Sequence, residues 1–140
     1  MDGQLATLRP LTNELIAAVL DAREFTYFTD DDGDIGGWWD DNLVYFFRLG
    51  DSGTLFQVRI RTRRTFEVDD VPRLYEFCNG WNHDKLWPKA YVHVNDDGSV
   101  LLCGEVFADL ERGVSFEQLD QLMMCGVSTG CELAAAAETL

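Results

Sequence analysis

The feature that most constrains the fold is a pair of strand-like runs, residues 42–49 and 54–62, joined by the turn sequence Gly50-Asp51-Ser52-Gly53. Because side chains on a strand alternate between two faces, this turn sets which residues lie opposite one another. We expect Leu49 to pair with Thr54, a register that makes one side of the hairpin apolar. We expect that side to face the core, and it comprises Leu43, Tyr45, Phe47, Phe56, Val58 and Ile60.

Helical patterns flank this hairpin. Apolar residues recur at helical spacing over residues 10–24 and 68–84, and a third helix begins at Ser115, where Gln118 completes a capping box. Thr12 or Asn13 could cap the first of these helices.

Two further stretches complete the pattern. Residues 25–29 are typical of a short strand, and residues 91–94 and 100–110 form a second hairpin around the turn at 95–98. The intervening residues 30–41, rich in aspartate and glycine, are expected to form an irregular loop.

The resulting order is α-β-β-β-α-β-β-α, which predicts an α+β fold with a five-stranded, mainly antiparallel sheet and helices packed on it. At 140 residues, the chain fits a single domain spanning residues 1–140.

Charge excludes two classes of partner. The chain has 11 Lys and Arg residues against 25 Asp and Glu, a net charge of −14, so nucleic acid and anionic membranes would be repelled. The N-terminus lacks a basic and apolar leader, and no apolar run reaches the length that spans a bilayer. Four widely spaced cysteines suit reduced thiols better than a zinc site, so we expect a cytoplasmic protein.

The aspartate loop resembles the start of a calcium-binding EF-hand only in part. Asp30, Asp32 and Asp34 alternate, but Ile35 and Asp41 stand where that motif needs glycine and glutamate. We therefore predict no metal ligands, no cofactor and no catalytic residues, and hence no enzyme. The open alternative is a ligand-binding or metal-binding protein, or an enzyme, that uses residues 30–41.

Arginines and tryptophans are the remaining candidates for a binding surface. The row that includes Arg59 and Arg61 could neutralise the aspartate loop or dock an acidic partner. The pairs Trp38-Trp39 and Trp81…Trp87 could close the core or line a groove for a partner.

Three clustered motifs, DDGDIGGWWDDNLVYFFRLG, WNHDKLWPKAYVHV and GEVFADLERGVS, make the chain resemble the YbjN family, also called bacterial sensory transduction regulators. The resemblance covers roughly residues 25–122. It rests on Asp32, Gly33, Trp38, Tyr45, Phe46, Phe47, Asn82, Lys85, Trp87, Pro88 and Lys89.

This resemblance implies a type III secretion chaperone-like fold and no catalytic residues. It points to a non-enzymatic regulator, in stress or signalling, that binds another protein, with a secretion chaperone for a client protein as the alternative. The candidate protein-binding residues are Trp38, Trp39, Arg59, Arg61, Trp81, Asn82, Lys85, Trp87 and Lys89.

We also expect a homodimer, because the sheet face opposite the helices would expose Val44 and Phe46 beside Trp38, Trp39 and Tyr91. Gly126 and Gly130 would let another backbone approach the third helix closely, although this spacing more often serves packing within one chain. Secretion chaperone-like proteins are commonly dimers, so the resemblance favours the same expectation.

Overall fold

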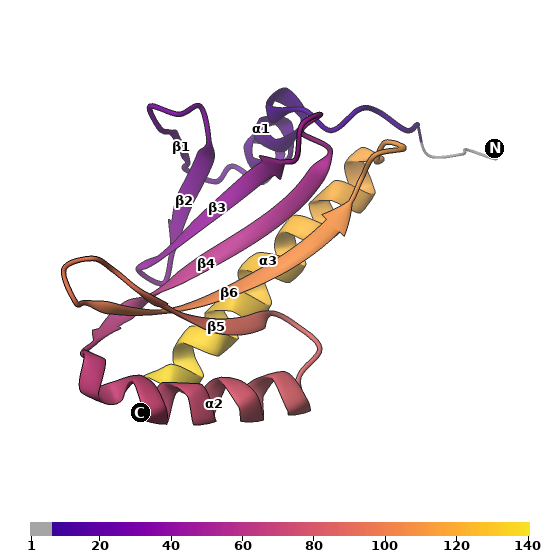
Figure 1. Cartoon of the computed structure of the whole chain (residues 1–140). Helices are drawn as coiled ribbons and strands as arrows, with labels where there is room; N and C mark the ends of the chain where they lie inside the picture. The colour runs from indigo at the N-terminus through magenta and orange to yellow at the C-terminus, as the bar shows by residue number, and fades with distance from the viewer. Residues whose placement is uncertain (1–6) are drawn as a thin grey trace.

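The computed structural model describes residues 7–140, which form one six-stranded antiparallel sheet with three α-helices (Figure 1). Its strands lie in the order β1-β2-β3-β4-β6-β5. Along the chain the elements are α1 (Asn13–Ala22), β1 (Phe28–Thr29), β2 (Ile35–Trp39), β3 (Asn42–Leu49), β4 (Leu55–Phe66), a 3₁₀ turn (Val68–Asp70), α2 (Val71–Asp84), β5 (Lys89–Val94), β6 (Val100–Asp109) and α3 (Phe116–Ala137). The predicted α+β class is confirmed.

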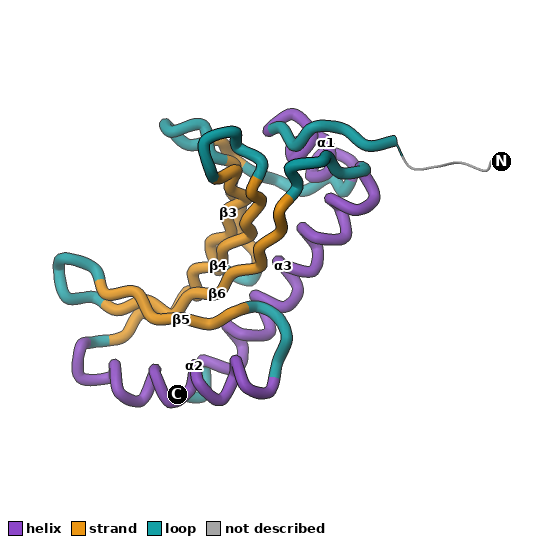
Figure 2. Tube along the Cα trace, turned by 45° about the vertical axis from the view of Figure 1, so that its right-hand side comes forward, coloured by secondary structure: helices purple, strands orange, loops and turns teal. Residues whose placement is uncertain are grey.

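All three helices pack on the same side of the sheet. The larger core lies between the sheet and α1 and α3, and a smaller one joins α2 to β5, β6 and the end of α3. Figure 2 shows the strands curving away from α3, so that the side of the sheet opposite α3 is concave and carries no helix.

The predicted helix starts are confirmed by their hydrogen bonds. The hydroxyl of Thr12 accepts from the backbone N–H of Leu15 at 3.1 Å and so caps α1. At α3, Ser115 Oγ accepts from the N–H of Gln118, and Gln118 Oε1 accepts from the N–H of Ser115, which is the predicted capping box.

The predicted register of the first hairpin is wrong by one residue. Leu49 pairs with Leu55, so the loop has five residues, of which Gly50 and Gly53 have positive φ. Thr54 belongs to the loop and does not pair with β3, because its carbonyl accepts a hydrogen bond from the N–H of Leu110 at 2.9 Å.

This shift exchanges the two faces of β3. Val44 and Phe46 are buried at 0% and 1% exposure beneath the helices, whereas Leu43, Tyr45 and Phe47 lie on the concave side. On β4 the predicted face is confirmed, since Phe56, Val58 and Ile60 are all buried. Beyond the paired residues of this hairpin, the carboxylate of Asp41 lies 3.7 Å from the guanidinium of Arg63.

The loop expected over residues 30–41 contains strand β2, which raises the number of strands from five to six. Its glycines allow close packing rather than a turn. A Cβ on Gly36 would lie 2.8 Å from the Phe28 ring, and one on Gly37 would lie 2.7 Å from the Trp39 ring. The irregular part is the short turn before the strand, where Gly33 has a φ of 85°.

The two glycines of α3 serve packing within the chain. A Cβ on Gly126 would lie 2.5 Å from Val58, and one on Gly130 would lie 2.8 Å from Ile60. The helix therefore sits directly on β4. Together with the burial of Val44 and Phe46, this removes two of the observations that led us to expect a homodimer.

Candidate functional site

The most distinctive surface is the concave side of the sheet, which we call the open face. It surrounds a hollow of about 250 Å³ and is defined by the residues that line this hollow: Leu43, Tyr45, Phe47, Arg59, Arg61, Tyr91, His93, Asn95, Leu101 and Cys103. They come from β3, β4, β5 and β6, and the strand pairing brings Tyr45 beside Arg59, Leu43 beside Arg61, and Tyr91 beside Cys103.

Arg59 lies at the centre of the open face and is held in place. Its guanidinium carbon lies 4.8 Å above the centre of the Phe47 ring, and one terminal nitrogen donates to Gln57 Oε1 at 2.8 Å. The Nε of Arg59 is buried without any hydrogen-bond partner. Within residues 7–140, no carboxylate lies within ion-pair distance of this guanidinium.

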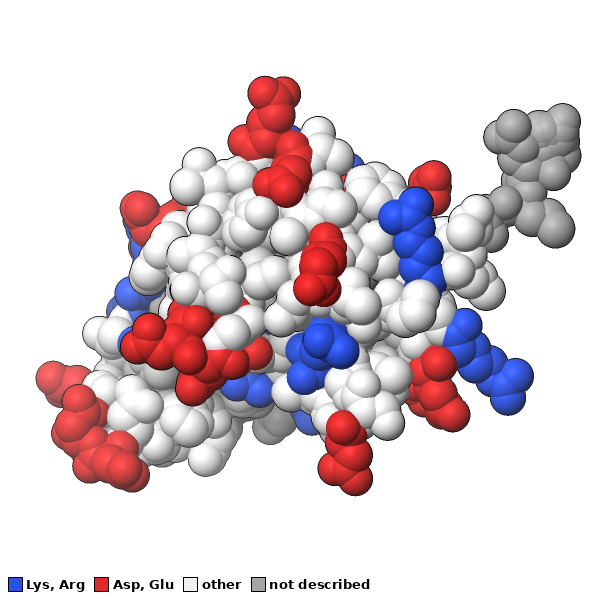
Figure 3. Space-filling model, turned by 90° about the horizontal axis from the view of Figure 1, so that it is seen from above, with Lys and Arg blue, Asp and Glu red and all other residues white. Residues whose placement is uncertain are grey.

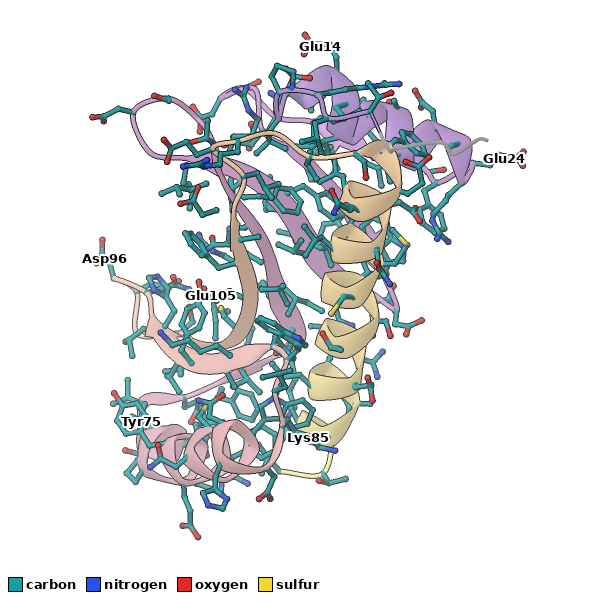
Figure 4. The ribbon with its side chains drawn as sticks, turned by 90° about the vertical axis from the view of Figure 1, so that its right-hand side faces the viewer. Glu14, Glu24, Tyr75, Lys85, Asp96 and Glu105 are labelled. Carbon is teal, nitrogen blue, oxygen red and sulfur yellow. The ribbon has the colours of Figure 1, made fainter. Side chains whose placement is uncertain are left out.

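Glu105 is the cross-strand partner of Arg59 between β4 and β6, and its carboxylate is engaged elsewhere. Glu105 accepts a hydrogen bond of 2.6 Å from Gln57 Nε2 and lies 3.9 Å from Lys89 Nζ. Figure 4 shows Glu105 on the side of the sheet that faces away from α3. Gln57 therefore links Arg59 to Glu105 through its two amide atoms.

Aromatic rings form the walls of the open face. Tyr45 and Phe47 are stacked with centroids 4.9 Å apart, and Phe28 meets Tyr45 edge-on at 5.7 Å. Burial raises the pKa of Tyr91 to about 12 and that of the neighbouring Cys103 thiol to about 11, so both groups are uncharged at neutral pH. Arg59 and Arg61 bring two positive charges to the hollow, and no Asp or Glu is among the residues that line it.

Four of the predicted binding residues lie on or beside the open face. Arg59 and Arg61 line it, and Lys89 lies on the same side of the sheet through its pairing with Glu105. Trp38 is 62% exposed and borders a second shallow hollow with Leu43 and Arg61.

Two other predicted residues serve the fold instead. Trp39 packs edge-on against Phe25 and Phe46 at 5.6 and 5.9 Å, inside the larger core. The side-chain amide of Asn82 forms hydrogen bonds of 2.8 and 2.9 Å with the backbone N–H and C=O of Ala90, which ties the end of α2 to β5.

The remaining three lie around the end of α2, away from the open face. Trp81 Nε1 donates to the carbonyl of Pro88 at 3.0 Å, and Lys85 Nζ lies 5.6 Å from the Trp81 ring. Trp87 is 38% exposed in the loop that follows. The nine predicted residues thus divide among the open face, the core and the region of α2.

The arginine row reaches the aspartate loop only at its end, where Arg63 lies 3.7 Å from Asp41. Arg63 bonds Glu138 at 3.0 Å, and the part of the chain that the structure describes holds no ion pair between an arginine and residues 30–34. Asp30 Oδ1 instead accepts from the backbone N–H groups of Asp32 and Asp34 at 3.0 and 2.9 Å, which shapes the turn.

Carboxylate oxygens of Asp30, Asp32 and Asp34 do lie within 4.8 Å of one another. Burial, followed by the charges of Asp30 and Asp32, raises the pKa of Asp34. Three carboxylates are fewer ligands than the 6–8 oxygens that calcium takes, and the expectation that this loop binds no metal stays a prediction.

Sequence reasoning missed most of the open face. Tyr45, Phe47, Tyr91, His93 and Cys103 were not among the predicted binding residues. Alternation along β5 and β6 could have found the last three, and the one-residue error in register hid the first two.

The arginines of the open face contrast with the rest of the surface. The net charge is −14, and Figure 3 shows acidic side chains in several groups on the side of the molecule seen from above.

In the described residues, no helix is long and apolar enough to cross a membrane.

Comparison with known proteins identifies relatives of this chain. In structure it is similar to YbjN of E. coli, whose crystal structure is described as that of "a putative transcription regulator", with a TM-score of 0.76, 16% identity and 95% of each chain covered. No curated protein sequence matches it. The family model of YbjN, "Putative bacterial sensory transduction regulator", matches residues 12–138. The chain therefore belongs to the YbjN family.

Proposed function

We propose that this protein is a non-enzymatic regulator that acts by binding another protein through the open face. The observation that carries the proposal is the preformed hollow. It has aromatic walls and an arginine, Arg59, that forms no ion pair with any carboxylate of residues 7–140. Arginine and tyrosine contribute strongly to binding energy where proteins meet. The description of the family as regulators supports the same role.

The cellular setting forms part of this proposal. All four cysteines are free thiols, which suits the reducing cytoplasm. Regulation in signalling is the context that the family description favours, and a role in stress belongs to the proposal alone. The more specific role of a secretion chaperone would require a dedicated client protein bound at the same face.

Charge reversal at Arg61 tests the proposal. Arg61 is exposed and makes no side-chain hydrogen bond in the described residues, so Arg61→Glu should leave the fold intact while reversing the charge of the open face. Arg112→Glu is the matched control, because Arg112 is exposed in the turn between β6 and α3.

The readout is quantitative mass spectrometry of proteins captured from a native lysate by the three forms of the protein. We expect a set of proteins retained by the wild type and by Arg112→Glu but lost with Arg61→Glu. Equal capture by all three forms would show that the open face is not the binding surface.

Homodimerisation stays a proposal, and the region of α2 offers a surface for it besides the open face. Around α2, Val68, Tyr75 and Leu86 are 56%, 55% and 80% exposed, which leaves apolar area that a second copy could cover. Sedimentation equilibrium at physiological salt tests this, since salt screens repulsion between two acidic copies. A single species of monomer mass would contradict it.

A further inference from the structure

Arg59 has no carboxylate partner among residues 7–140, although the chain is rich in acidic residues. Acidic residues outnumber basic ones by 25 to 11, yet Arg59 has no carboxylate within ion-pair distance among the described residues, and its buried Nε has no acceptor. Buried polar groups in native proteins are almost always hydrogen-bonded, so a buried Nε–H without an acceptor is unusual. An acceptor supplied from outside the chain would account for this arrangement.

The guanidinium is also fixed before any ligand arrives. It stacks on Phe47 and is held by Gln57, which is itself held by Glu105. A donor that is already oriented loses little entropy when it binds a carboxylate. Arg61 lies two residues further along the same side of β4, about 7 Å away, and adds a second positive charge.

The side chains around Arg59 and Arg61 indicate which kind of residue a partner would carry beside its carboxylate. Tyr45, Phe47, Tyr91 and Leu101 form apolar walls next to the two guanidinium groups. In an extended segment, every second side chain points to the same side. A carboxylate and an apolar side chain two residues apart would therefore reach the arginines and the aromatic wall together.

Acids at the borders of the open face exclude a polyanion. Asp30 lies close enough to contribute, after burial, to the raised pKa of Tyr45. Asp96 stands at the tip of the β5–β6 turn, as Figure 4 shows. A run of negative charges would meet these carboxylates on either side, whereas a single acidic residue with uncharged neighbours would not.

We propose that the open face, taken as the protein-binding surface proposed above, recognises an extended segment of the partner that sets one Asp or Glu carboxylate against Arg59 and Arg61. An apolar side chain two residues away fills the hollow between Tyr45 and Tyr91. This assignment deepens the proposed function by naming the chemistry of the partner.

Selection of short random peptides displayed on phage tests this inference. We expect the enriched sequences to share one acidic residue with an apolar residue two positions away. A synthetic enriched peptide should bind the wild type and Arg112→Met equally, and Arg59→Met at least about tenfold more weakly. Its counterpart with the acidic residue changed to the corresponding amide should show the same loss on the wild-type protein, which no folding defect can explain.

A second measurement follows the Nε atom of Arg59 directly by NMR. The ¹⁵N-labelled Nε–H group of Arg59 gives its own NMR signal, which should move on addition of the acidic peptide and stay in place with the amide peptide. Enriched peptides that bind the open face without a shared acidic residue would overturn this inference and leave the proposed function standing. Peptides whose binding is unaffected by both Arg61→Glu and Tyr91→Ala would overturn both.

Discussion

Neighbouring phenylalanines on β3 offer a direct test of the hairpin register. Phe46 is 1% exposed and packs edge-on against Trp39 in the larger core. Phe47 is half-buried on the open face, between Tyr45 and Arg59. Replacement of each by alanine removes the same atoms from opposite sides of one strand.

The expected costs follow from these surroundings. Phe46→Ala leaves a cavity in a packed core and should lower the free energy of unfolding by about 3–5 kcal/mol. Phe47→Ala loses one stacked ring and part of its buried area, for which we expect about 1–2 kcal/mol. Phe107→Ala is the control, because Phe107 is 47% exposed and its loss should cost under about 1 kcal/mol.

Urea unfolding followed by tryptophan fluorescence measures these differences. With an m-value of about 2 kcal/mol per molar urea, the midpoint should fall by roughly 2 M for Phe46→Ala and by less than about 1 M for Phe47→Ala. If Phe47→Ala proved as costly as Phe46→Ala, or more so, β3 would have the register that the turn sequence first suggested.

Three further predictions concern packing, pH and metal. Gly126→Ala should destabilise the protein by about 1–3 kcal/mol in a thermal melt despite alanine's helix propensity, because its Cβ would lie 2.5 Å from Val58. The Arg23–Asp120 pair, at 2.6 Å, lowers the pKa of Asp120 chiefly through its hydrogen bond, so its contribution exists above the unfolded-state pKa and is lost as pH falls. Asp120→Asn should therefore lower the urea midpoint at neutral pH and lose this effect well below pH of about 4. Millimolar calcium should leave the melting temperature nearly unchanged, whereas a micromolar site at residues 30–34 would add about 4 kcal/mol at a thousandfold excess.

Local patterns in the sequence were sufficient to predict much of the fold. The helix caps at Thr12 and Ser115 and the second hairpin depend on residues close together in the chain, and each forms as expected. The fold class followed from the order of these elements.

Long-range contacts explain what the sequence could not provide. The carbonyl of Thr54 bonds Leu110, far along the chain, and that bond lengthens the loop and exchanges the faces of β3. Gly36 and Gly37 predict a loop by themselves, but the rings of Phe28 and Trp39 lie over them and make them strand residues. The open face depends on both contacts. Of the residues that line it, only Arg59 and Arg61 were predicted as binding residues and Tyr91 as part of an exposed sheet face, together with Trp38 beside them.

The most direct test of the proposed function is photo-crosslinking at a single position in living cells. A photoreactive benzoyl-phenylalanine replaces Tyr91 on the open face in one variant and Glu14, exposed on α1, in the other (Figure 4). We predict discrete crosslinked adducts to a partner protein from position 91 and none from position 14. Adducts from position 14 in place of position 91, or from neither position, would contradict binding at the open face.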